Sequence, residues 1–222
     1  MSVSVAERLG LRNRDPVLVE TLRQRHTEPH RHYHDWSHVE ALARAFASGI
    51  LPFTNEQAVG LAILYHDAIY DPRSATNEAD SAALLLAERR NREDAGTLTL
   101  AAAMIRATAS HLLPEDLTGT DRTDAAGFLD LDLGILAAPP AAYDAYVADV
   151  RREYAHVEEA AWRAGRGMVL AGFAARERLF LTEEGFARWE APARANIARE
   201  RAALEGERGA RVPRPSPFLR GS

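Results

Sequence analysis

One segment limits the folds open to this chain more than any other. Residues 58–65 are apolar or aromatic apart from Gly60, so a helix there would show apolar side chains on nearly all sides. Thr54 and Gln57 have the spacing of a helix-capping pair, and Asp71-Pro72 follows the segment. A helix without a polar face must be covered by other elements all round. We therefore expect a central helix here, enclosed by the rest of the chain.

The remaining segments also show helical periodicity and residues typical of helix boundaries. Asp15-Pro16 and Ser37 are typical helix starts, and Gly49 is a typical stop. Further helices are expected over 16–25, 37–46, 77–90, 98–111, 125–136, 142–164, 168–181 and 183–204. No alternation of apolar and polar residues persists long enough to predict a strand. The aromatic residues expected in the core are Tyr143, Tyr146, Tyr154, Trp162 and Trp189.

These segments predict an all-α fold, a helical bundle of about eight or nine helices. The sequence shows no internal repeat and no linker that would divide it, so we expect a single domain over residues 1–205. Residues 206–222 contain three prolines and no apolar pattern, and are expected to form a flexible C-terminal tail.

Composition excludes several classes of function. The 222 residues include no cysteine, which excludes disulfides, thiolate metal sites and cysteine nucleophiles. The net charge of -5 provides no basic field for duplex nucleic acid, so no such partner is expected. Residues 1–10 do not resemble a secretory signal, and no run reaches the ~18–20 apolar residues of a membrane span. We expect a cytoplasmic protein without a membrane partner. The sequence does not indicate the oligomeric state.

The residues that suggest chemistry are histidines and aspartates next to apolar helices. They are His38 near a helix start, the pair His66-Asp67 at the end of the most apolar helix, and Asp130 and Asp132 between leucines. Each alone has an ordinary structural explanation. A buried ionised aspartate, however, is costly unless it is paired or bound to a metal. The side chains of neighbouring helical residues point about 100° apart around the axis. One ion could therefore bind both His66 and Asp67 only if it lay between this helix and its neighbours.

In this pattern the chain resembles the HD superfamily of metal-dependent phosphohydrolases, which has an H…HD…D motif on a helical core. The similarity to a bacterial branch of predicted HD-type phosphohydrolases runs through most of the chain. The similar stretches are 31–39, 63–71, Asn77-Glu78 with Ser81, Ala107-Thr108 with His111, 130–133, Tyr143, Tyr146, Arg151, Glu153-Tyr154, His156-Val157 and 194–196. The resemblance implies an HD-domain bundle with His38, His66, Asp67 and Asp132 as metal ligands.

The last ligand of this set requires a choice between two aspartates. Asp130 and Asp132 lie about 200° apart around a helix, so they cannot both face one ion. Asp132 is preferred because Leu133 and the residues after it resemble the spacing that follows the final aspartate in the family.

The resemblance implies hydrolysis of a phosphomonoester or phosphodiester bond in a small phosphorylated molecule, with a nucleotide as the expected substrate. Asp67 would orient or deprotonate the attacking water. Nitrogen and oxygen ligands without thiolate suit Mn²⁺, Fe²⁺, Co²⁺, Ni²⁺ or Zn²⁺, and the sequence does not choose among these metals or between one ion and two.

Five further residues have both a functional and a structural interpretation. Glu78 is a candidate general acid or water-positioning residue, or an acidic residue that complements its helix dipole. His34 and His111 could contact the substrate, or lie in a loop and at a helix end. Arg73 and Arg106 are candidate phosphate ligands, or ordinary surface arginines.

Two other functions remain open at this point. An HD-fold di-iron oxygenase needs additional histidines between the HD pair and the last aspartate, and only His111 lies in that interval. A non-catalytic HD module that senses a nucleotide would retain the fold without turnover.

Overall fold

The computed structural model describes residues 4–10 and 16–210, and within them every regular element is helical. The prediction of an all-α fold is confirmed. The elements are α1 (Val5–Arg8), α2 (Pro16–Arg25), α3 (Trp36–Ala47), α4 (Glu56–Tyr65), α5 (Asn77–Arg89), α6 (Ala95–Ala107), α7 (Gly119–Asp132), the 3-10 helix η1 (Leu133–Ala137), α8 (Pro140–Glu153), α9 (Glu159–Ala174) and α10 (Glu183–Ala210). The expected helix cap at Asp15 lies outside the described residues, as does the part of the expected tail from 211 to 222.

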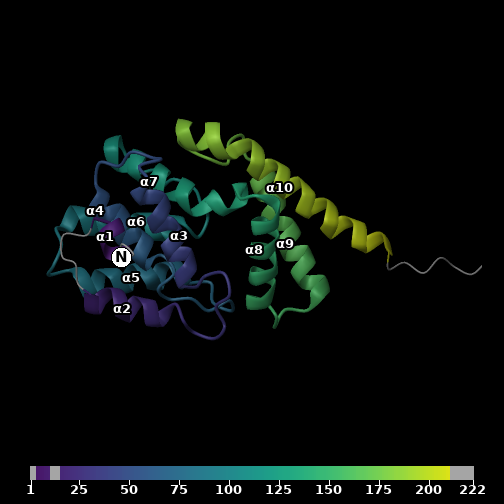
Figure 1. Ribbon diagram of the computed structural model, residues 1–222, viewed down its shortest axis with the longest axis horizontal. Coiled ribbons are helices and arrows are strands. Elements are labelled where there is room, and N and C mark those ends of the chain that lie inside the picture. The colour runs from purple at the N-terminus through teal and green to yellow at the C-terminus, as the bar shows by residue number, and fades with distance from the viewer. Residues whose placement is uncertain (1–3, 11–15, 211–222) are drawn as a thin grey trace, which may run out of the picture.

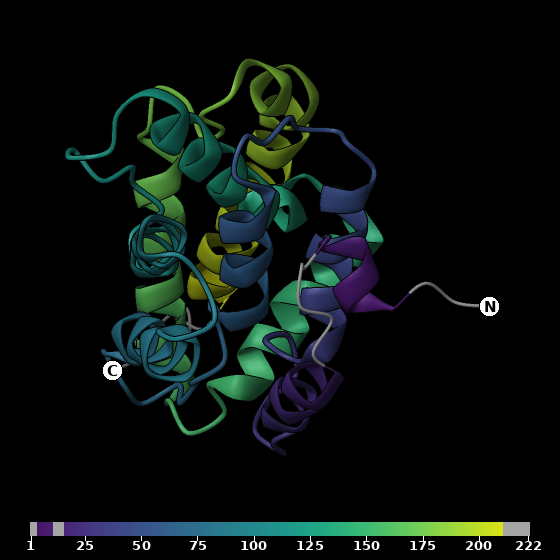
Figure 2. The ribbon, with the colours of Figure 1, turned by 90° about the vertical axis from the view of Figure 1, so that its left-hand side faces the viewer.

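Helix α4 is the centre of the first group of helices, as its apolar sequence predicts. Every residue from Gln57 to Tyr65 is buried, and α2, α3, α5, α6 and α7 all contact it. Figure 2 shows α4 in blue, with the purple N-terminal helices on one side and the teal α5 and α6 on the other. The residues that follow α4 are therefore held deep in the molecule.

The cap of α4 joins it to two other helices. Asn55, rather than the predicted Thr54, accepts a hydrogen bond from Ala58 N and donates one to Thr97 of α6. The carboxylate of Asp124, in α7, accepts hydrogen bonds from the backbone N–H groups of Thr54 and Asn55 at 2.8 and 2.7 Å. The predicted cap of α3, Ser37, is two residues too late, because Asp35 caps this helix by accepting from Ser37 N.

Two predicted helices in the C-terminal half are wrong. The predicted helix 142–164 is broken, because α8 ends at Glu153 and α9 begins at Glu159. The break is stabilised by the Arg151 guanidinium, which donates to the carbonyls of Tyr154 and Val157. The contact is local, but a side chain that binds backbone carbonyls leaves no periodic pattern in the sequence.

The second wrong helix is 168–181, since α9 ends at Ala174 and an irregular segment connects it to α10. Arg194 donates to the carbonyls of Arg176 and Glu177, and Glu190 accepts from the backbone N–H groups of Leu179 and Phe180. The side chains of α10 thus replace the helical hydrogen bonds that this segment lacks.

The buried apolar residues form two clusters. One joins α1 to α7, and the other joins η1, α8, α9 and α10, while Trp189 packs against both. Figure 1 shows α8 and α9 beyond the end of the first group of helices, with α10 running along them. In the second cluster Arg166 and Tyr143 both bind the buried carboxylate of Glu200. Helix α10 continues through Gly206 to Ala210.

In residues 4–10 and 16–210 no single helix is long and apolar enough to cross a membrane. Only the bent pair Gly119–Ala137 and Pro140–Glu153 has, taken together, the length and composition of a membrane span.

The tie between α7 and the start of α4 gives a stability prediction. Asp124→Ala leaves two backbone N–H groups without their charged acceptor, so we expect the free energy of unfolding to fall by about 2–3 kcal/mol. Asp121→Ala, on the exposed first turn of the same helix, is the control and should cost no more than about 1 kcal/mol. Urea unfolding of both variants measures this difference, and equal losses would contradict the assigned role of Asp124.

Candidate metal centre

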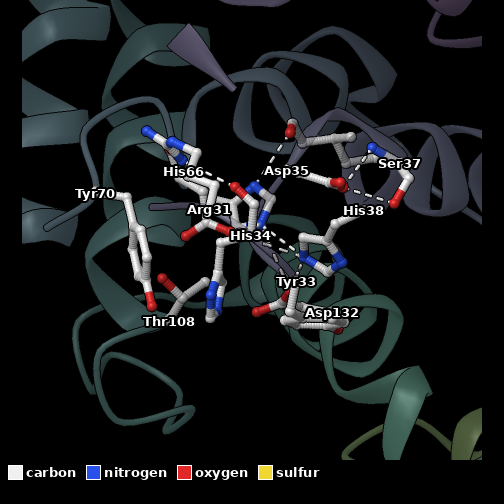
Figure 3. A network of polar contacts seen from close by, with 12 residues as sticks. Arg31, Tyr33, His34, Asp35, Ser37, His38, His66, Tyr70, Thr108 and Asp132 are labelled. Atoms are coloured by element: carbon white, nitrogen blue, oxygen red, sulfur yellow. Dashed lines mark hydrogen bonds and ion pairs between the residues drawn. The ribbon is translucent and has the colours of Figure 1, made fainter. Parts of the chain in front are cut away.

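Four of the predicted residues are brought together by three helices. His38 lies in the first turn of α3, His66 and Asp67 follow α4, and Asp132 is the last residue of α7. His38 and His66 are buried, and the side chains of Asp67 and Asp132 are only 15% and 10% exposed. Figure 3 shows His38, His66 and Asp132 within one polar network.

The distances within this group are those of ligands around one ion. The Nε2 atoms of His38 and His66 are 3.1 Å apart, and Asp67 Oδ2 is 3.0 Å from His66 Nε2. Asp132 Oδ1 is 3.2 Å from His38 Nε2 and 3.6 Å from His66 Nε2. Two ligand atoms each about 2.1 Å from one metal, at tetrahedral or octahedral angles, would be about 3.0–3.4 Å apart. His38, His66 and Asp67 form a group that could hold a metal ion.

Two further observations fit a cation at this point. His66 Nδ1 is 3.1 Å from the carbonyl of Ile63 and can donate a hydrogen bond to it, so Nε2 is the atom that would bind a metal, which would displace the proton held there. Asp67 Oδ2 is buried and makes no hydrogen bond of good geometry, although His66 Nε2 lies 3.0 Å from it. A buried carboxylate oxygen without a donor is unfavourable, whereas a metal ion would compensate it. The donor set therefore fits a divalent cation.

The charges of the group act strongly on one another. Burial lowers the pKa of His66, but the carboxylates of Asp67 and Asp132 outweigh burial and raise this pKa to about 9. Burial alone would raise the pKa of Asp67, yet the imidazoles around it hold this pKa below its usual range. The site thus keeps its carboxylates ionised, which is the state that binds a metal.

His34 stands next to this group and is held by a carboxylate for which the sequence indicated no role. Glu153, at the end of α8, accepts from His34 Nδ1 at 2.7 Å and from the Tyr70 hydroxyl at 2.8 Å. Its other oxygen accepts the backbone N–H groups of His32, Tyr33 and His34 at 2.8–2.9 Å. These hydrogen bonds lower the pKa of Glu153 to about 2, against the opposing effect of burial. One buried carboxylate therefore fixes the loop before α3 and the ring of His34.

Arg31 joins the same loop to the segment after α4. Its buried guanidinium donates to the carbonyls of His34 and Asp67 at 3.0 and 2.7 Å, and its Nε donates to Glu28 at 2.9 Å. Arg31 binds the backbone carbonyl of Asp67, so it positions this residue without using the Asp67 carboxylate.

His111 binds the second carboxylate oxygen of Asp132, the one that does not contact His38. Its Nε2 is 2.9 Å from Asp132 Oδ2, and its backbone has a φ of 50°, which is rare for a residue with a side chain. Arg176, just after α9, donates to the carbonyls of Ser110 and His111 at 2.7 and 2.9 Å. The turn that carries His111 is thus held in place from the second cluster of helices.

The group opens into a cavity of about 810 Å³ between the two groups of helices. His38, His66, Asp67 and Asp132 all contribute to its wall, and so do His34 and His111. Tyr146, Tyr154 and Trp162 also line it, so these aromatic residues, expected in the core, stand at the cavity instead.

The structure separates the remaining predicted residues. Asp130 does not face the histidines, because its fully buried carboxylate accepts from Leu181 N, Thr182 N and the Thr182 hydroxyl at 2.6–2.8 Å. Glu78 is half-buried and lines the cavity. Arg73 and Arg106 are exposed and are not among the residues that line it.

Comparison of the chain with protein-family models, with curated proteins and with solved structures finds no significant match. The resemblance to the HD superfamily therefore stays a prediction, and the geometry of the site must carry any functional conclusion.

The different roles of the two aspartates can be separated by one pair of variants. Asp132→Ala removes an oxygen beside both histidines, so the folded protein should lose most of its affinity for a divalent metal. Asp130→Ala leaves the metal group intact but deprives three donors of their acceptor, so it should lower the free energy of unfolding by about 2 kcal/mol or more. Calorimetric metal titration and urea unfolding check both variants, and the reverse pattern would reassign the ligand to Asp130.

The Glu153–His34 contact predicts a change that NMR can follow. Burial lowers the pKa of His34, but the charges of Asp67 and Glu153 together raise it above its usual value. Glu153→Gln removes one of these charges, so the pKa of His34 should fall. The control is Glu159→Gln, which removes a partly exposed carboxylate of α9 that pairs with Arg151. An imidazole titration of metal-free protein that is the same in all three forms would contradict the contact.

Proposed function

We propose that this protein is a metal-dependent phosphohydrolase that acts on a small phosphorylated molecule. The observation that carries the proposal is the buried Asp67 Oδ2, which lies 3.0 Å from His66 Nε2 and 3.9 Å from His38 Nε2, at the wall of a cavity large enough for a substrate. Cavities of about 300–1,000 Å³ are usual for small-molecule sites.

In this proposal His38, His66, Asp67 and Asp132 hold one divalent ion. The donor set contains imidazole and carboxylate and no thiolate, which suits Mn²⁺, Fe²⁺, Co²⁺, Ni²⁺ or Zn²⁺. When bound, such an ion lowers the pKa of a coordinated water and polarises a phosphoryl oxygen. His111 fixes the Asp132 carboxylate from behind, as outer hydrogen-bond partners do for metal ligands.

The other residues supply positioning and proton transfer. Asp67 remains ionised, so its carboxylate can accept a hydrogen bond from the attacking water and orient it. His34 Nδ1 donates a hydrogen bond to Glu153, which leaves Nε2 as the ring atom available to a phosphoryl oxygen in the cavity. Glu78 stands on the same wall and is the candidate donor of a proton to the leaving alcohol. These roles together form a hydrolytic site for a phosphate ester.

The test of the proposal uses Asp67→Asn, which keeps the side-chain volume and removes the charge. Wild-type protein with a saturating divalent metal should release phosphate or a nucleoside monophosphate from at least one member of a panel of phosphate esters, and chelation should abolish this release. Asp67→Asn should lose it as well, whereas Asp71→Asn, an exposed position in the following loop, should retain it.

Thermal unfolding gives a readout that does not depend on turnover. A metal at 100 times its Kd should stabilise the wild type by about 2.7 kcal/mol, and Asp67→Asn should gain much less. Equal metal-induced gains would remove Asp67 from the site. Tight nucleotide binding without any metal-dependent release would instead indicate a sensor.

A further inference from the structure

We propose that the substrate carries a single phosphoryl group on a bulky aromatic or aliphatic alcohol, and that this alcohol binds against α9. The inference rests on the proposed function and adds the class of substrate to it. Two properties of the cavity carry it: the composition of the wall formed by α8 and α9, and the number of cations available to phosphate.

The wall formed by α8 and α9 is almost wholly apolar or aromatic. The side chains of these two helices that line the cavity include Tyr146, Val150, Trp162, Val169 and Phe173, and among them only Arg166 is charged. Trp162 and Tyr154 pack with their ring centroids 5.4 Å apart. A small polar phosphate ester would leave such a wall wet, whereas an aromatic or aliphatic body would bury it.

Small residues on α9 create the room for this body. Ala161, Gly165 and Gly172 recur at helical spacing on the side of α9 that lines the cavity. A Cβ atom built on Gly165 or Gly172 meets no atom within 4 Å. Glycine inside a helix costs roughly 0.5–1 kcal/mol relative to alanine, so stability does not explain these residues. The space that they leave open is part of the cavity.

The charges of the cavity match one phosphate rather than a polyphosphate. Two arginines line it, and Arg166 is already paired through two nitrogens with Glu200. Among the described residues, Arg176 is the lining cation with no carboxylate partner, since it contacts backbone carbonyls. One phosphate carries about -1.5 to -2 charges at neutral pH, which a divalent ion and one arginine can compensate.

The experiment fills the cavity without touching the metal group. Gly165→Leu places a side chain in the open space beside Trp162, and Gly167→Leu makes the same change on the same helix outside this cavity. Neither position has an atom within 4 Å of the new Cβ, and leucine favours a helix over glycine, so both variants should fold. The probes are 1-naphthyl phosphate, an alkyl phosphate, a nucleoside monophosphate, the matching triphosphate and methyl phosphate.

Wild-type protein should show its highest kcat/KM with 1-naphthyl phosphate, the alkyl phosphate or the nucleoside monophosphate. The preferred probe among these three identifies the class of alcohol. Gly165→Leu should lower that value by about 10-fold or more, as steric discrimination in a binding pocket does, and leave methyl phosphate unaffected. Gly167→Leu should behave as the wild type with every probe.

A preference for the triphosphate or for methyl phosphate would overturn this inference and leave the proposed function intact. So would equal effects of the two leucine variants on bulky substrates. Absence of metal-dependent hydrolysis of every probe would overturn the proposed function itself, and this inference with it.

Discussion

The structure depends on placing an ionised aspartate at the end of its most buried helix. Helix α4 has no polar face, so packing on all sides carries His66 and Asp67 into the interior. Burial of such a charge is unfavourable unless something compensates it. Two imidazoles reach it from α3 and from the end of α4, and Asp132 approaches the same point from α7. A divalent cation would balance this set, which is why we interpret the geometry as a metal centre rather than as a hydrogen-bonded core.

The second group of helices completes the site instead of merely adjoining it. Glu153 of α8 fixes three backbone N–H groups of the loop before α3 and orients His34. Arg176, after α9, holds the turn of His111, which in turn binds Asp132. The same helices form the apolar wall of the cavity. Metal ligation by one group of helices and substrate enclosure by the other would thus be coupled through a few polar contacts.

The parts of this account that the sequence could predict are those with a local cause. Helix α4 is recognisable because its apolar residues leave no polar face, and the pair His66-Asp67 stands out because it follows that helix. The angular separation of Asp130 and Asp132 correctly requires them to face different partners, as the hydrogen bonds of Asp130 to Leu181 and Thr182 show.

The remaining features have causes that lie far away in the chain. Glu153 acts on residues about 120 positions earlier, and nothing near it marks it as different from other helical glutamates. The break after α8 is an exception, because Arg151 binds carbonyls only three and six residues away, but amphipathic residues on both sides of the break hide it in the sequence. Arg176 and the open space at Gly165 gain their meaning only from the tertiary arrangement around the cavity.

The most direct test of the metal centre is X-ray absorption spectroscopy of protein loaded with one equivalent of Zn²⁺ or Mn²⁺. The account predicts a single class of ion with two imidazole ligands, from His38 and His66, and with oxygen ligands completing the shell. For Zn²⁺ the nitrogen and oxygen distances should be about 2.0–2.2 Å. His66→Ala should remove one imidazole from the spectrum. A bound ion with no imidazole ligand, or the absence of stoichiometric binding, would contradict the account.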